Sequence, residues 1–217
     1  MDVGVAGGGM HIHIGRGMQQ RRRDMKLKLG TRISFTGVGG AGKTTLANWM
    51  HDEYNCKIVS SVTRSVYQQH DLTETDIEKL SPEKAWELQR AIFTAHEQQQ
   101  ARMFNATPGI NPATVSERTL IDHYSYSIYR CRNYEGLTRA TAATRRTRAI
   151  NQANKYDLII HLSPPTWKLK DDGFRQASDA DRLILDALIH QTLSYVDPTR
   201  VFHIAVSYTH LTLPTKA

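Results

Sequence analysis

Cysteine and long apolar runs are both scarce in this chain of 217 residues. The two cysteines, Cys56 and Cys131, form no CxxC pair, so we expect neither a disulfide scaffold nor a cysteine metal site. The best apolar stretch, residues 158–162, is interrupted by His161 and is far shorter than the roughly 20 residues of a membrane-spanning helix. The N-terminus has no continuous apolar segment of the secretory type. These absences favour a cytoplasmic protein without a membrane partner.

Acidic residues are outnumbered by basic ones. The chain has 28 Lys and Arg against 21 Asp and Glu, a formal excess of seven positive charges. Residues 1–24 carry two of these charges and Lys216 carries one, so the excess over residues 25–206 is four. Net charge concerns association and solubility rather than fold. This mild excess suits a polyphosphate ligand and leaves weak contact with nucleic acid open.

The two ends of the chain differ in pattern from the rest. Residues 1–24 contain three consecutive glycines, an HIH triplet and three consecutive arginines without helical or strand periodicity. We expect them to be a disordered extension or the result of a start assigned too early. Residues 207–217 resemble the translation of a sequencing adapter, which predicts a non-native tail. Residues 25–206 show no repeat or linker and are expected to form one domain.

One motif carries most of the functional information. Residues 37–44 read GVGGAGKT and match the phosphate-binding pattern GxxxxGK[ST] at every fixed position. Residues 32–36 before it have strand-like alternation, and residues 44–53 after it have helical spacing without Gly or Pro. A strand, a glycine-rich loop and a helix in this order predict a nucleotide-binding loop. The residues expected to bind the nucleotide are Gly37, Gly39, Gly40, Ala41, Gly42, Lys43, Thr44 and Thr45.

The chemistry of such a loop follows from its backbone. Glycines allow a tight turn and a close approach to an anion, while successive N–H groups and the helix N-terminus face the phosphates. We expect Lys43 to reach the β- and γ-phosphates as a catalytic residue. The hydroxyl of Thr44 is expected to bind Mg²⁺.

Two common classes of P-loop protein are disfavoured by the strand patterns. Motor ATPases need an apolar strand that ends in an acidic residue, whereas the acid of residues 156–162, Asp157, stands near the beginning. The letters of the NKxD guanine-binding motif of GTPases occur at residues 154–157. They precede this strand, however, and would therefore lie at the edge opposite the nucleotide.

An acid–arginine pair follows a second short strand. Residues 114–116 are rich in β-branched residues and lead into Glu117 and Arg118, after which Thr119 and Asp122 predict a capped helix start. A pair at the carboxyl end of a parallel strand lies in the crevice that binds ligands. We expect Glu117 to hold Mg²⁺ through water or to accept the acceptor's proton, and Arg118 to bind phosphate as a catalytic and substrate residue. Asp122 is a candidate substrate contact; a surface ion pair with a capping acid is the alternative.

Two further basic elements are candidate contacts for substrates. Arg64 follows the strand pattern of residues 57–59 and is a candidate acceptor contact, with a solvated arginine as the alternative. Residues 162–175 combine Pro, Gly and cations after an apolar strand, which predicts a lid over the phosphates; a plain solvated loop is the alternative. The lid cations are Lys168, Lys170 and Arg175, of which Arg175 is also a candidate catalytic residue.

The combination of GVGGAGKTTLA, SVTR, SERTLIDHYSY and YDLIIHL…DDGFR…DADR resembles a family of P-loop nucleoside and nucleotide kinases common in bacteriophages. It is similar to the nicotinamide-riboside kinase domain of a bacterial NAD regulator and, more distantly, to thymidylate and deoxynucleoside kinases. The resemblance runs from about Arg32 to Val206 in the same motif order. It implies an α/β P-loop three-layer sandwich with about five parallel strands and a short lid. The cofactors that it implies are ATP and Mg²⁺.

The resemblance also implies roles for single positions. Glu117 and Arg118 take the place of the family's acid–arginine pair, and Arg175 takes that of a lid arginine. The family often has an acidic residue where this chain has Ser61, so the identity of the acceptor base stays open. The remaining candidates for that base are Glu117, Asp122 and Asp171.

Two long helices are predicted outside these motifs. Ser81 and Pro82 begin one that continues to Met103, in which Trp86 and Phe93 are expected to pack in the core rather than on a base. Residues 137–155 form the other. Its arginines are expected to be a solvated face, with a polynucleotide-binding face as the alternative. They are Arg139, Arg145, Arg146 and Arg148.

Taken together, these patterns predict an enzyme that transfers the γ-phosphoryl group of ATP to a hydroxyl or phosphate of a small nucleoside or nucleoside monophosphate. A polynucleotide 5′-kinase and a non-catalytic ATP-binding regulator are the alternatives. We expect the protein in the cytoplasm of a bacterial cell or a phage-infected host. Neither the acceptor nor the oligomeric state follows from the sequence.

Overall fold

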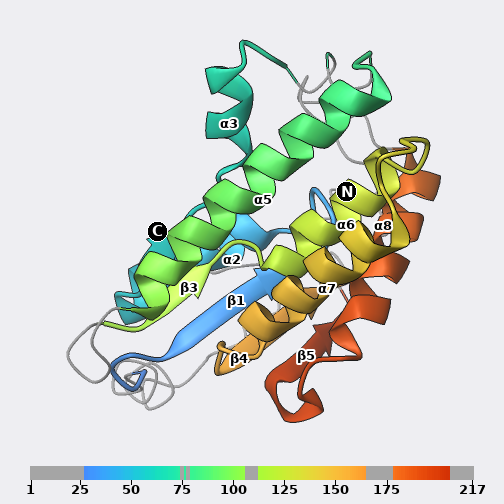
Figure 1. The fold of residues 1–217 in the computed structure, drawn as a ribbon. Coiled ribbons are helices and arrows are strands. Elements are labelled where there is room, and N and C mark those ends of the chain that lie inside the picture. Colours follow the sequence, from blue (N-terminus) through green and yellow to red (C-terminus); the bar gives the residue numbers. More distant parts are fainter. Residues whose placement is uncertain (1–26, 74–75, 77–78, 106–111, 165–177, 206–217) are drawn as a thin grey trace, which may run out of the picture.

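Parallel strands form one sheet at the centre of the protein (Figure 1). They are β1 (Arg32–Thr36), β2 (Lys57–Val59), β3 (Thr114–Ser116), β4 (Leu158–Leu162) and β5 (Val201–Ile204). Their order in the sheet is β2-β3-β1-β4-β5, and every neighbouring pair is parallel. All carboxyl ends therefore meet at one edge. The chain leaves β1 toward one side of the sheet and later crosses to the other, which creates the switch point where such sheets bind ligands.

In this computed structural model, the described residues are all those outside 1–26, 74–75, 77–78, 106–111, 165–177 and 206–217. Several sequence predictions lie outside the described residues: the extension 1–24, the tail 207–217, the lid cations Lys168, Lys170 and Arg175, and the base candidate Asp171.

Helices cover both faces of the sheet, so the described chain has the predicted three-layer α/β architecture (Figure 1). They are α2 (Lys43–Tyr54), α3 (Thr63–Gln69), α5 (Pro82–Phe104), α6 (Leu120–Arg130), α7 (Arg139–Ala153), α8 (Asp179–Leu193) and the short 3-10 helix η1 (Pro198–Arg200). Helix α2 packs on β1, β2 and β3, and α6 packs against α5, α7 and α8. Helix α6 therefore lies between other helices, and its first turn contacts the phosphate loop of residues 37–44. None of the helices in the described part of the chain is long and apolar enough to cross a membrane.

The helix starts predicted at Ser81 and at Thr119 are confirmed. The Ser81 hydroxyl accepts a hydrogen bond from a backbone N–H in the first turn of α5. Thr119 with Asp122, and Ser178 with Asp181, each form a reciprocal capping box at the start of α6 and α8. In each box the two side chains satisfy N–H groups that the helix itself leaves without a partner.

Apolar side chains of β1, β3 and β4 form the core of the domain. Ile33, Val115 and Ile159 are at most 2% exposed. Trp86 and Phe93 of α5 are buried as well, which confirms that they pack in the core. Burial of such side chains supplies most of the free energy that stabilises a domain of this kind.

The prediction that the arginines of α7 form a solvated face is wrong for Arg145. This residue is only 6% exposed, and its guanidinium carbon lies 4.7 Å from the ring centre of Trp86 and 4.3 Å from that of Phe93. Its Nη2 atom donates to the carbonyl of Gln89 and to the hydroxyl of Ser127. Burial lowers the pKa of Arg145 to about 10. The sequence pattern misses this placement because the aromatic partners come from another helix.

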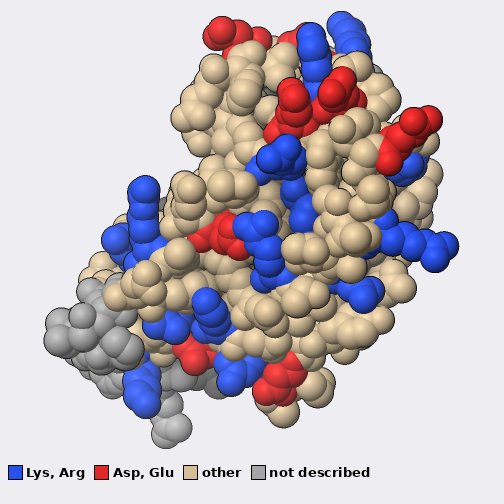
Figure 2. Space-filling view, viewed as in Figure 1, with Lys and Arg blue, Asp and Glu red and all other residues tan. Residues whose placement is uncertain are grey.

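The other arginines of α7 do not extend as a basic stripe. Arg148 forms an ion pair with Glu97 of α5, and Arg146 lies over the ring of Tyr195. Figure 2, which shows the face where α5 and α7 lie, has Asp and Glu interspersed among the Lys and Arg side chains. The structure therefore gives no support on this face to the alternative of polynucleotide binding.

Candidate functional site

A cavity of about 520 Å³ lies at the carboxyl edge of the sheet, beside the phosphate loop of residues 37–44. Its size falls within the range of small-molecule sites in proteins. The fold brings to its wall residues predicted from three separate motifs: Gly39, Gly40, Gly42, Lys43, Thr44, Thr45, Arg64, Glu117 and Arg118. Three other predicted residues, Gly37, Ala41 and Asp122, are buried and are not among the residues that line the cavity.

The phosphate loop depends on glycine at two positions. Gly37 has a φ of +136°, and a Cβ atom built there would lie 2.4 Å from the carbonyl oxygen of Leu162 in β4. Gly42 has a φ of +89° and caps the N-terminus of α2. Residues with a side chain rarely adopt these conformations. The glycines therefore fix how the loop leaves β1 and how it enters α2.

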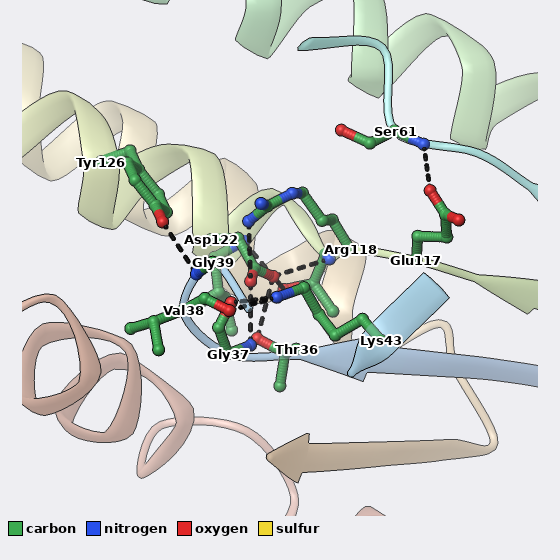
Figure 3. Close-up of polar contacts among 12 residues, drawn as sticks. Thr36, Gly37, Val38, Gly39, Lys43, Ser61, Glu117, Arg118, Asp122 and Tyr126 are labelled. Atoms are coloured by element: carbon green, nitrogen blue, oxygen red, sulfur yellow. Dashed lines mark hydrogen bonds and ion pairs between the residues drawn. The ribbon is translucent and has the colours of Figure 1, made fainter. Parts of the chain in front are cut away.

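Lys43 begins α2 and is itself almost completely buried. Its Nζ atom donates to the carbonyl oxygens of Gly37 at 2.7 Å and Val38 at 2.6 Å, so the side chain folds back over the loop (Figure 3). Thr44 and Thr45 follow in the first turn and line the cavity. A glycine cradle, an ammonium group and a helix N-terminus beside one cavity fit the triphosphate of a nucleotide.

Helix α6 holds the phosphate loop at two points. The fully buried carboxylate of Asp122 accepts hydrogen bonds from the Gly37 amide at 3.0 Å and the Thr36 hydroxyl at 2.8 Å. One turn later, the hydroxyl of Tyr126 accepts a hydrogen bond from the Gly39 amide at 3.2 Å (Figure 3). Asp122 and Tyr126 share a face of the helix because they are four residues apart.

Asp122 also caps its own helix by accepting from the amide and hydroxyl of Thr119. Its Oδ1 atom lies 3.6 Å from Nη1 of Arg118. The carboxylate thus has four hydrogen-bond donors within the protein. This arrangement favours a positioning role for Asp122, and its predicted contact with substrate stays a prediction.

Glu117 follows β3 and forms hydrogen bonds with the end of β2 and with the residues after it. Its amide donates to the carbonyl of Val59, and its Oε2 atom accepts from the Ser61 amide at 2.9 Å. Ser61 also lines the cavity, but Glu117 is the sole acidic residue among the described residues of the wall. Carboxylate and hydroxyl oxygens suit Mg²⁺, so Glu117 and Thr44 fit the predicted metal site, which stays a prediction.

Guanidinium groups from three elements line the cavity. Arg64 comes from α3, Arg118 precedes α6, and Arg130 ends α6. The guanidinium carbons of Arg118 and Arg130 lie 5.4 Å and 5.8 Å from the ring centre of Tyr126. Arg130 and Tyr126 were not predicted from the sequence as residues of the site. Their spacing of four residues on the helix that follows Arg118 was the available signal.

Four more wall residues carry no sequence signal of their own. Tyr67 comes from α3, Gln89 and Ile92 from α5, and His123 from α6. His123 is 3% exposed, and its Nε2 atom has no hydrogen-bond partner among the described residues. Burial, followed by the charges of nearby histidine and cationic residues, lowers the pKa of His123 well below its usual value. A neutral imidazole nitrogen therefore lies at the wall of the cavity.

A family model described as an AAA domain matches residues 32–202. No curated protein sequence matches the chain.

Solved structures share the fold at low sequence identity. The NadR protein in complex with NR has 17% identity and a TM-score of 0.57, over 84% of this chain and 46% of that one. Deoxyadenosine kinase from M. mycoides with bound dATP has 14% identity and a TM-score of 0.55, over 81% and 91% of the two chains. Thymidylate kinase from Ehrlichia chaffeensis has 14% identity and a TM-score of 0.52, over 81% and 86%. The chain thus spans about half the length of the NadR structure, and the similarity establishes a nucleoside-kinase-like P-loop fold.

Proposed function

We propose that this chain, which belongs to the family described as an AAA domain, transfers the γ-phosphoryl group of ATP to a small nucleoside or nucleoside monophosphate. The observation that carries this proposal is that the phosphate loop and the predicted acceptor residues line the same cavity. One wall is the phosphate loop with Lys43, and the others bring Arg64, Glu117 and Arg118 to the same space. Phosphoryl transfer needs this combination, because its catalysis consists mainly of positioning and of stabilising negative charge.

The donor side of the site is the phosphate loop. Its amides and the first turn of α2 bind the phosphates of ATP, and Lys43 moves from its carbonyl partners to the β- and γ-phosphates. Thr44 and Glu117 hold Mg²⁺, which offsets the negative charge of the phosphates when it is bound. Asp122 and Tyr126 keep the loop in place from α6.

The acceptor side is the part of the cavity beyond the loop. Arg64 and Arg118 orient the acceptor, and Tyr67 and Ile92 add an apolar wall. A deoxyadenosine kinase and a thymidylate kinase share the fold, which supports an acceptor of the nucleoside or nucleotide class. Lys168, Lys170 and Arg175, which belong to the predicted lid, are proposed to close over the phosphates.

Replacement of Lys43 tests the assignment. In Lys43→Ala we expect kcat to fall by at least about 100-fold because the ammonium group that stabilises the transferring phosphoryl group is lost. The matched control is Lys57→Ala, which removes an exposed lysine at the start of β2 and is expected to keep full turnover. Turnover is measured as ADP release with a panel of nucleosides and nucleoside monophosphates, and folding by circular dichroism.

Two results would contradict the proposal. One is wild-type turnover in folded Lys43→Ala. The other is a wild-type protein that binds ATP and Mg²⁺ but phosphorylates no member of the panel, which is the behaviour of an ATP-binding regulator.

A further inference from the structure

We propose that Tyr126 is a catalytic residue, whose hydroxyl group donates a hydrogen bond to the phosphoryl group while that group moves from ATP to the acceptor. This inference rests on the proposed function and adds a residue to it. It is supported by the place of the hydroxyl beside the phosphate loop, by the direction of its hydrogen bond, and by the contacts that hold the side chain.

The hydroxyl of Tyr126 lies where the phosphate loop meets the cavity. Tyr126 and Gly39 both line the cavity, and a hydrogen bond of 3.2 Å joins the two residues (Figure 3). The amides of such a loop are the groups that bind the phosphates of a nucleotide. A phosphate oxygen that takes the hydrogen of the Gly39 amide therefore comes to lie beside the Tyr126 hydroxyl.

The direction of this hydrogen bond leaves a donor on the side of the tyrosine. The Gly39 amide donates and the Tyr126 oxygen accepts. A phenolic hydroxyl both accepts and donates, so its own hydrogen is directed to another partner. The oxygens of a phosphoryl group carry negative charge and only accept hydrogen bonds, so they fit this donor.

Contacts of the ring and of its helix hold Tyr126 in this place. The guanidinium carbons of Arg118 and Arg130 lie 5.4 Å and 5.8 Å from the ring centre. One helical turn before Tyr126, the carboxylate of Asp122 accepts a hydrogen bond from the Gly37 amide, which fixes α6 against the loop. A donor that is already in position needs little reorganisation when negative charge spreads over the transferring group, and such donors contribute strongly to catalysis.

A purely structural role of the hydroxyl predicts different behaviour. If the hydroxyl only anchors the loop, its removal loosens Gly39, which raises KM for ATP and leaves kcat unchanged. If the hydroxyl contacts the transferring phosphoryl group, its removal lowers kcat. KM for ATP then stays nearly constant, because a phosphate takes the Gly39 amide in the bound state and Asp122 still holds Gly37.

Tyr126→Phe separates the two roles, because it removes the hydroxyl and keeps the ring that contacts the guanidinium groups. With the panel of nucleosides and nucleoside monophosphates, we expect kcat to fall at least about tenfold while KM for ATP changes less than about threefold. Tyr124→Phe is the matched control on the same helix, since Tyr124 is half-buried and is not among the residues that line the cavity. Its kcat should stay within about twofold of the wild-type value. Circular dichroism checks that both variants fold.

A binding measurement tests the same contact without turnover. Aluminium fluoride, added with ADP and Mg²⁺, imitates the phosphoryl group during transfer, and a site built for that state binds such an analogue tightly. By isothermal titration calorimetry, we expect aluminium fluoride to tighten the binding of ADP to the wild-type protein. This gain in affinity should be at least about tenfold smaller in Tyr126→Phe, with the same affinity for ADP alone.

Three results would overturn this inference. Unchanged kcat and an unchanged gain from aluminium fluoride in Tyr126→Phe would show that the hydroxyl does not contact the transferring group, while leaving the proposed function intact. A rise in KM for ATP with unchanged kcat would assign the hydroxyl to the anchoring role alone. A wild-type protein that binds ATP and Mg²⁺ but phosphorylates no member of the panel would contradict the proposed function, and this inference with it.

Discussion

The carboxylate of Asp122 accepts a hydrogen bond from the Gly37 amide at 3.0 Å, across 85 positions of sequence. The same carboxylate caps α6 through Thr119 and binds the Thr36 hydroxyl. One buried side chain therefore joins the end of β1, the start of the phosphate loop and the first turn of α6. The position of Arg118, which precedes α6, is tied to the position of the loop by this contact.

Asp122→Asn is expected to loosen this junction. The amide group of asparagine presents N–H atoms to donors that need an acceptor, so we expect a loss of about 2–4 kcal/mol in the free energy of unfolding. KM for ATP should rise because Gly37 loses its anchor. Asp181→Asn is the control, since it alters the capping box of α8 without touching the loop. Urea unfolding and initial rates measure the two effects; an unchanged KM for ATP in Asp122→Asn would refute the anchoring role.

Gly37→Ala is expected to be far more harmful than Gly39→Ala. The new Cβ at Gly37 would lie 2.4 Å from the Leu162 carbonyl, at a φ of +136° that alanine rarely adopts, whereas at Gly39 the contact is an ordinary 3.8 Å. We predict a cost of at least about 2 kcal/mol for the first substitution and within about 0.5 kcal/mol for the second. Thermal and urea unfolding give both values. Similar costs would show that the close approach to β4 does not constrain the loop.

Arg145→Lys tests the buried cation of α7. Lysine cannot keep both hydrogen bonds, to the Gln89 carbonyl and the Ser127 hydroxyl, while lying flat between Trp86 and Phe93. We expect a loss of about 2 kcal/mol in the free energy of unfolding. Arg146→Lys on the same helix keeps a half-buried charge near the ring of Tyr195 and should change stability by less than about 0.5 kcal/mol. Equal stability of the two variants would mean that Arg145 does not join α5, α6 and α7.

Acid should destabilise the protein through His96. Burial lowers the pKa of His96 from 6.5 to about 4. Between these two pH values the imidazole is protonated in the unfolded chain and neutral in the folded chain. Stability from this residue is intact above pH 6.5 and falls as the pH drops toward 4, by on the order of 3 kcal/mol. In His96→Gln, which has no titrating ring, urea unfolding should show a shallower loss over that interval. The same slope in both proteins would exclude His96 as its source.

Local patterns in the sequence determined much of this protein. The strand, glycine loop and helix around Lys43 and the capping boxes at Thr119 and Ser178 follow from residues close together in the chain. The parallel sheet was expected from the resemblance to P-loop kinases, and its strand pairs join distant segments. Hydrogen bonds within a turn and the spacing of apolar residues are short-range properties. For that reason they can be read without knowing what packs against them.

Only the tertiary structure decided which side chains meet. Asp122 was expected at a helix start, but its bond to Gly37 depends on α6 lying beside β1. Arg145 was predicted to be solvated, but in the structure its guanidinium group packs against two aromatic rings of α5, those of Trp86 and Phe93. The wall of the cavity joins Tyr67, His123 and Arg130 from helices whose relative positions are set by packing across the sheet. Such contacts arise from many weak interactions between distant segments, and no window of sequence contains them.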